Sequence, residues 1–255
     1  MKMKPLATAI LLSLGTAAHA YQIEVNAGAT QADPDADVRN TYGFSVDGIY
    51  HLSRVNVGSD PLAEAAFLNR SSNISVLVDH TVQGDDAQGE SAFKTYTQQI
   101  GVEYYVPNNM LYFAASLANN RQAGDDEQDV GIRVGLTPIQ GLLLTVGWQD
   151  NQHNDSDSFG LDAKYVTMLG DYFVNFEAGY EKHDVDADDD ETISLGVDFY
   201  IDTSWSIGLA YADDLGDERT SLRTRKFFED NIAAGLSYTS GDVADTIAID
   251  FTMRF

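Results

Sequence analysis

The feature that most constrains this chain is a two-residue alternation that runs to its last residue. Between Asp245 and Phe255, isoleucine, phenylalanine and methionine take every second position, and smaller or polar residues take the positions between them. Side chains alternate between the two faces of a β-strand, so this segment predicts a strand with one apolar and one polar face. In a membrane-spanning barrel the apolar face of such a strand meets lipid and the polar face meets the lumen.

The same alternation recurs along the chain and predicts about 14 strands. Their expected ranges are 21–30, 42–52, 73–82, 94–106, 110–120, 130–137, 142–149, 159–168, 172–182, 192–201, 205–213, 220–228, 232–239 and 245–255. The weakest of them is 220–228, which we include because both ends of a closed barrel are expected on the same side of the membrane, which needs an even count. Counts of 12 and 16 strands remain open alternatives.

Aromatic residues recur where these strands end, as in Tyr104-Tyr105, Phe199-Tyr200 and Phe227-Phe228. Rings at both ends of membrane strands form the interfacial girdles of outer-membrane barrels. Acidic loops are expected at one end, at 84–90, 124–129, 150–158 and 184–191, and short turns at the other. The predicted fold is therefore an all-β, transmembrane, antiparallel up-and-down barrel, with its long loops extracellular and its short turns periplasmic.

The N-terminus predicts export. Lys2 and Lys4 precede a short apolar run that ends at Ala18-His-Ala20, as in a cleaved signal peptide, and the run is too short to span a bilayer as a helix. We therefore expect a signal peptide at 1–20, a barrel at 21–255 and a location in the cell outer membrane. The chain has no cysteine and a net charge of −25, which excludes disulfides and argues against nucleic acid as a partner.

Charged residues inside the strands are candidates for the pore wall, since Arg or Lys facing lipid near the bilayer midplane would cost about 2–4 kcal/mol. The candidate pore-lining residues are Glu24, Asp47, Asp79, Glu103, Arg133, Asp162, Lys164, Glu177, Asp198, Arg223, Arg225 and Asp250. They form either the wall of an open pore, with bases opposing acids across it, or a filled lumen in which the charges pair. Acids outnumber bases, which predicts a mild preference for cations.

The region 53–70 is the one break in the alternation. Asp60-Pro61 followed by Leu-Ala-Glu-Ala-Ala-Phe-Leu predicts an N-cap at Asp60, proline at the first helical position and a short helix. Leu62, Ala65, Ala66 and Phe67 would form its apolar stripe. We expect this periplasmic connection either to cap or plug the lumen or to form a stapled turn.

Two other kinds of site are not supported by the sequence. Asp184–Glu191 begins like a calcium-binding loop, but Asp189 stands where that pattern needs glycine and Leu195 where it needs glutamate. We expect loose contact with the divalent ions that bridge lipopolysaccharide, and no metal site or cofactor. A lipid-modifying enzyme would need a serine–histidine pair at the lipid interface, and no motif specifies one. A non-conducting structural or adhesive barrel is the remaining alternative.

The leader, the acidic loops, the aromatic-ended hairpins and the terminal Met253-Arg-Phe255 together resemble a Gram-negative outer-membrane porin. The segment Pro61-Leu-Ala-Glu-Ala-Ala-Phe-Leu-Asn-Arg-Ser-Ser72 is similar to one in the "putative general bacterial porin" family of gammaproteobacteria. The resemblance implies a passive channel for small polar solutes, in contact with outer-membrane lipids and lipopolysaccharide. It also implies that Phe255 is an assembly signal for the barrel-assembly machinery. The chain is shorter than the large trimeric porins and lacks their long third loop, so a trimer is not implied.

Overall fold

A computed structural model describes residues 20–34, 40–84, 93–122, 125–151, 156–185, 188–214 and 216–255. The predicted signal peptide lies outside the described residues except for Ala20, which begins the first strand.

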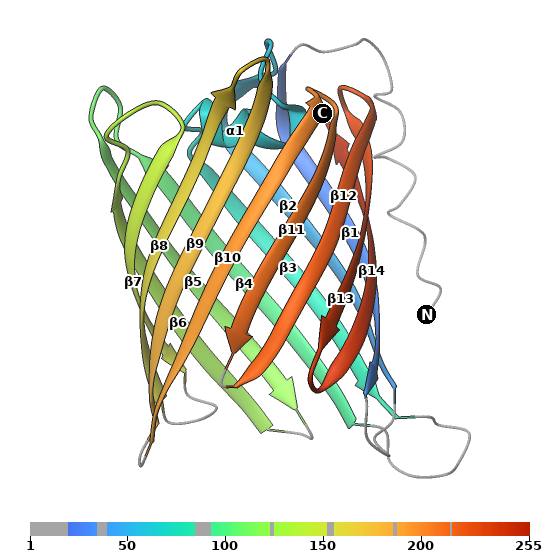
Figure 1. The fold of residues 1–255 in the computed structure, drawn as a ribbon. Coiled ribbons are helices and arrows are strands. Elements are labelled where there is room, and N and C mark those ends of the chain that lie inside the picture. The colour runs from blue at the N-terminus through green and yellow to red at the C-terminus, as the bar shows by residue number, and fades with distance from the viewer. Residues whose placement is uncertain are drawn as a thin grey trace, which may run out of the picture.

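The described chain forms a closed barrel of fourteen antiparallel strands, as predicted (Figure 1). The strands are β1 (Ala20–Pro34), β2 (Thr41–Asn56), β3 (Asn73–Gln83), β4 (Phe93–Tyr105), β5 (Leu111–Gln122), β6 (Asp125–Leu136), β7 (Leu142–Asn151), β8 (Ser156–Leu169), β9 (Tyr172–Val185), β10 (Asp188–Asp202), β11 (Trp205–Asp214), β12 (Asp217–Glu229), β13 (Ile232–Gly241) and β14 (Ala244–Arg254). Each strand pairs with its neighbours in sequence, and β1 pairs with β14. Closure leaves no free strand edge, which lipid could not hydrogen-bond.

The two ends of the barrel differ. One end, here called the turn end, carries the C-terminus, the segment 57–72 and the short turns, and it lies at the top of Figure 1. Asn108, Gly141 and Gly170 adopt positive φ at three of these turns, where asparagine and glycine tolerate the left-handed region best. The other end is here called the loop end.

The strands reach further toward the loop end than the alternation of side chains predicts. Segments 124–129, 150–158 and 184–191 were expected to be acidic loops, yet β6 begins at Asp125 and β10 at Asp188, and Asp184 pairs with Asp189 in the β9–β10 hairpin. This part of the prediction is wrong because the backbone ladder continues whether the side chains are apolar or charged.

The barrel wall has two chemically distinct faces. Large apolar side chains point outward and are exposed, among them Phe251 (58%), Leu236 and Leu195. The alternate positions carry the polar and charged residues, and cross-strand register keeps them on one face, as in Glu24 opposite Arg254. Within the described residues, no helix is long and apolar enough to cross a membrane.

The segment 57–72 folds into a 3-10 turn, η3 (Leu62–Glu64), that leads into one turn of α-helix, α1 (Ala65–Leu68). The short helix was predicted, but Asp60 is not its N-cap: Pro61 takes that position, and no side chain caps the helix. The large or small apolar side chains that are buried in the two helical turns are Leu62, Ala65 and Leu68, whereas Ala66 and Phe67 of the predicted stripe are half-buried. One full turn of a 3-10 helix rotates the buried face relative to a regular α-helix.

This segment packs against the inner surface of the barrel. Leu62 and Ala65 join a buried cluster with Tyr21 and Val55 from the first two strands and Phe227 from β12. Inward-facing residues from one arc of the wall, which runs from β12 through β14 and β1 to β2, therefore meet the same short helical segment. Its apolar contacts hold the segment inside the turn end of the lumen.

Candidate functional site: the lumen and the segment across its turn end

All of the predicted pore-lining residues lie on the inner face of the wall. The register places Asp47 beside Asn26 and Leu77, and it places Lys164 beside Glu177, with each pair sharing the face that contacts the segment 57–72. The alternation carries this assignment around the ring through Glu24, Asp79, Glu103, Arg133, Asp162, Asp198, Arg223, Arg225 and Asp250. That ions pass along these residues is a proposal, taken up below.

The densest charge cluster lies on β8–β12. Arg223 makes a bidentate contact with Asp198, with Nε and Nη2 each 2.7 Å from a carboxylate oxygen, and Nη2 also donates to Glu177 at 3.1 Å. Asn175 donates to both of these carboxylates, at 2.9 and 3.1 Å. Lys164 donates to Glu177 at 3.2 Å. Paired charges with several hydrogen bonds each are the form in which ions tolerate partial burial.

The contact between Arg223 and Asp198 crosses an intervening strand, and a glycine makes this possible. In register, Asp198 lies opposite Gly208 on β11, and Gly208 lies opposite Arg223 on β12. A Cβ atom at position 208 would lie 2.0 Å from Asp198 Oδ1 and 3.0 Å from the Arg223 side chain. The absence of a side chain on β11 therefore lets two strands that are not neighbours form an ion pair.

Two further lumen arginines are also paired with acids close by. Arg225 contacts Asp250 at 3.1 Å, and Arg254 contacts Glu24 at 2.7 Å. The Arg254 guanidinium also stacks between the Tyr21 and Phe227 rings, 4.4 and 4.5 Å from their centroids. The sequence left open whether the lumen bases face acids across the pore or pair with acids nearby. On this side of the barrel they pair with acids nearby.

The lumen acids of β2–β4 that were predicted to line the pore have neutral hydrogen-bond donors instead. Asp47 accepts from Asn26 at 2.9 Å, Asp79 from Thr81 at 3.0 Å and Glu103 from Asn73 at 3.2 Å. Neutral donors leave the carboxylate charge uncompensated. This side of the lumen is therefore the more negative one.

Glu64, which the sequence did not single out, connects the helical segment to the charge cluster. It is 5% exposed, and its carboxylate accepts from Tyr200 Oη at 2.7 Å and lies 2.9 Å from Lys164 Nζ. Lys164 also lies over the Phe67 ring, 5.1 Å from its centroid. The one sequence signal for this role is a single acid within an otherwise apolar short helix, where burial without a partner would be costly.

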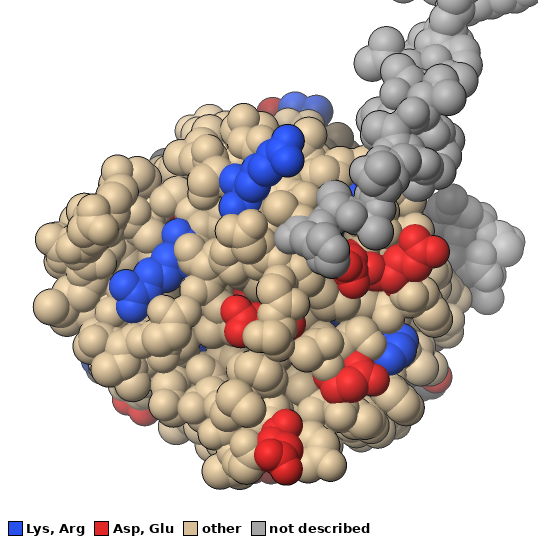
Figure 2. Space-filling view, turned by 90° about the horizontal axis from the view of Figure 1, so that it is seen from above, with Lys and Arg blue, Asp and Glu red and all other residues tan. Residues whose placement is uncertain are grey.

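Backbone hydrogen bonds attach the same segment to several other strands. The Leu62 N–H donates to Thr203 O at 2.7 Å, and Arg254 donates to Leu62 O at 2.8 Å. On the opposite side, Arg70 donates to Thr137 O at 3.0 Å, and Gln140 donates to Leu68 O at 2.6 Å. The segment thus crosses the barrel, and the centre of the turn end is filled with atoms when viewed along the axis (Figure 2).

A serine and a histidine do meet in the structure, but not where a lipid-modifying enzyme would need them. Ser71 Oγ lies 3.0 Å from His51 Nδ1, and both residues are buried on the inner side of the wall. The His51 ring packs edge-on against Tyr21, with centroids 5.4 Å apart. This pair has no access to the lipid face and supports the packing of the segment.

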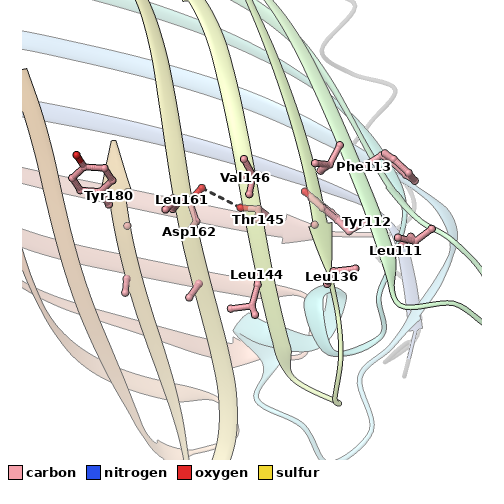
Figure 3. Close-up of a pocket in the computed structure, with 15 residues that line it drawn as sticks. Leu111, Tyr112, Phe113, Leu136, Leu144, Thr145, Val146, Leu161, Asp162 and Tyr180 are labelled. Carbon is pink, nitrogen blue, oxygen red and sulfur yellow. Dashed lines mark hydrogen bonds between the residues drawn. The ribbon is translucent and has the colours of Figure 1, made fainter. Parts of the chain in front are cut away.

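The outer wall also carries a large apolar groove of about 650 Å³ (Figure 3). Ala163 and Ala178 form a cross-strand pair there between Leu144 and Leu195, so two small side chains interrupt a row of large ones. Leu136, Val146 and Leu161 border the hollow, whereas Thr145 donates to Asp162 on the inner side (Figure 3). Because the groove faces lipid, it is not part of the solute path.

A closed fourteen-stranded barrel with an apolar outer wall and a charged lumen defines a channel of the outer membrane. The chain belongs to the family described as "putative general bacterial porin", whose model matches residues 2–170. The family assignment inferred from the leader, the hairpins and the Pro61–Ser72 segment is confirmed, as is the location in the outer membrane.

A solved outer-membrane protein shows the same fold. The outer membrane protein Omp33 of Acinetobacter baumannii is 22% identical and aligns with a TM-score of 0.70, over 93% of this chain and 99% of that one. OmpF of Salmonella typhi is 10% identical with a TM-score of 0.48, over 91% of this chain and 97% of that one. No curated protein sequence matches the chain significantly.

Proposed function

We propose that this porin passes small hydrophilic solutes passively through its lumen. The observation that supports this most is the continuous ring of polar and charged residues on the inner face of all fourteen strands. Such a wall is compatible with water and polar solutes and needs no cofactor. Swelling of protein-containing liposomes in neutral sugars of increasing size tests the proposal. Swelling that falls with sugar size supports it, and no swelling with any sugar supports the non-conducting alternative.

The proposed channel prefers cations mildly. The bases on β8–β14 are paired with acids, whereas Asp47, Asp79 and Glu103 have only neutral hydrogen-bond donors and no basic partner among the described residues. A pore with excess negative charge concentrates cations. The sign of the reversal potential in a potassium chloride gradient tests this preference, and a clearly anion-selective current would refute it.

In this proposal the turn end faces the periplasm, and the segment 57–72 narrows the lumen there. The apolar cluster around Leu62, the Glu64–Lys164 ion pair and the backbone contacts to two turns all support a plug over a simple stapled turn. Deleting residues 60–69 should raise single-channel conductance several-fold. An unchanged conductance from a folded barrel would dispose of the plug.

The remaining partners follow from the position in the membrane. The acidic loop end would face lipopolysaccharide and its bridging divalent ions, and Phe255 would be read by the barrel-assembly machinery. Backbone contacts support a structural role for this last residue as well, because Phe255 O accepts from Gln22 N at 2.7 Å and Phe255 N donates to Ile23 O at 2.8 Å. The protein is proposed to act as a channel and not as an enzyme.

A further inference from the structure

The inner wall contains a hollow that is separate from the Glu64 cluster. It has a volume of about 230 Å³ and extends from β3 to β9. Small residues form its floor, and they occupy consecutive strands in register: Gly101, Ser116 and Gly131. Next to this row, Gly147 lies opposite Gly160. A Cβ added at Gly160 would have one heavy atom within 4 Å, a backbone oxygen at 3.8 Å. The wall is therefore thin here because side chains are missing, not because strands separate.

Charged side chains border this floor. Arg133 and Glu103 share one cross-strand row, two strands apart, which corresponds to about 10 Å between their backbones. Glu181 lies further along the same row, opposite Gly160, and Asp162 lies beside it. The hollow thus combines three carboxylates with one guanidinium.

Arg133 differs from the other lumen arginines in having unused donors. Arg223, Arg225 and Arg254 each donate hydrogen bonds of 3.1 Å or shorter to a carboxylate. Within the described residues Arg133 donates none, and its nearest ionic contact is a single Nε–Oδ2 distance of 3.5 Å to Asp162. Its side chain is 56% exposed. A guanidinium with five donors in a fork suited to carboxylates is therefore available to a ligand.

Gly147 sets the position of this guanidinium. It lies opposite Arg133 on the next strand, and a Cβ there would be 3.0 Å from Arg133 Cγ and 3.4 Å from Nε. The Arg133 side chain therefore lies flat over β7 and extends into the hollow. A larger residue at 147 would push it away from the floor.

Two of the acids have no basic partner among the described residues and can therefore pair with a cationic ligand. Glu103 accepts from Asn73, and Glu181 accepts from Ser158 at 2.5 Å. Both donors are neutral, and among the described residues neither glutamate takes part in an ion pair. With three acids and one base, the hollow has a net charge of −2, from −3 for the acids and +1 for Arg133.

We propose that this hollow binds an α-amino acid with a cationic side chain as it passes through the channel. The carboxylate of the solute would take the free Arg133 donors, and its two cationic groups would take Glu103, Glu181 or Asp162. Such a solute matches both the presence of one base and the excess of acids, which a sugar or a simple inorganic cation does not. That the solute binds during passage rests on the proposed channel function. The hollow itself is part of the wall whether or not the barrel conducts.

Isothermal titration of the folded full barrel in detergent tests binding directly. L-lysine is compared with norleucine, which lacks the side-chain ammonium, and with cadaverine, which lacks the carboxylate. Losing one charge-assisted contact should weaken binding about tenfold or more, so both analogues should bind more weakly than lysine. Equal heats for all three solutes, or no binding of lysine, would overturn the proposal.

Variants assign the contacts. Arg133→Gln should abolish the advantage of lysine over cadaverine and leave its advantage over norleucine. Glu181→Gln should reduce the advantage over norleucine. Asp126→Asn, an acid at the loop end outside the hollow, is the control and should change neither ratio. Identical ratios in all variants would refute the assignment, and a parallel conductance recording separates failure of the site from failure of the channel.

Discussion

Replacing Glu64 by alanine should release the segment 57–72 from the charge cluster and open the turn end. Glu64 is 5% exposed and is in contact with Lys164 at 2.9 Å and Tyr200 at 2.7 Å. Removing one partner of a buried ion pair costs about 3–5 kcal/mol. Lys164 keeps Glu177 at 3.2 Å and is 29% exposed, so the expected loss in docking free energy is smaller, about 2–3 kcal/mol.

At about 1.4 kcal/mol for each tenfold, that loss raises the ratio of released to docked segment about 30- to 140-fold. Single-channel recordings should then show a larger conductance, or longer visits to it, than the wild type shows. The Asp126→Asn variant, which removes a carboxylate at the loop end, away from the segment, should keep the wild-type distribution of conductance levels. A folded Glu64→Ala barrel with wild-type recordings would show that Glu64 does not hold the segment in place.

Three further predictions concern the wall and its closure. Gly208→Ala should separate Arg223 from Asp198 and lower the free energy of unfolding, measured by urea titration, by about 1–3 kcal/mol. Gly48→Ala, whose added Cβ has no atom within 4 Å, is the control and should not lower it. Equal stabilities of the two variants would refute the role of Gly208. Arg223→Gln should leave Asp198 without a basic partner and Glu177 with Lys164 alone, and so shift the reversal potential further toward cations. Arg121→Gln, which removes a base paired with Asp126 at the loop end, is the control, and a shift toward anions in the Arg223 variant would contradict the prediction. Deleting Phe255 should remove the backbone contacts to Gln22 and Ile23 and reduce the amount of folded barrel in the outer membrane, measured by heat-modifiable gel mobility. Normal levels of the folded form would argue against the assembly role.

The wall of the barrel could be predicted because lipid on the outside favours apolar side chains and water in the lumen favours polar ones, so the two kinds alternate along each strand. Even the weakly apolar 220–228 segment could be assigned, since closure demanded an even count, and β12 is present at Asp217–Glu229. Asp47 and Arg225 could be assigned to the inner face because charged side chains avoid lipid. Where both faces meet water, as at Asp125–Asp129, the selection disappears, so the alternation could not show that β6 starts there.

The contacts inside the lumen could not be predicted for a different reason. Alternation fixes the face of a residue but not its vertical position relative to other strands, which depends on the register and stagger of the whole ring. Asp198, Gly208 and Arg223 come together only through two registers, and Glu64 meets Lys164 only because the segment folds back across the barrel. The sequence carries only local signals for these contacts: a single acid within an otherwise apolar short helix, and a glycine within an otherwise regular strand.

The most direct test of the account is the single-channel current of the purified wild-type barrel in a planar bilayer with symmetrical salt. We expect discrete and reproducible conductance steps, which should be small for a fourteen-stranded barrel because the segment 57–72 crosses its turn end. A folded, membrane-inserted barrel that gives no steps would contradict the claim that this lumen is a path for ions and solutes.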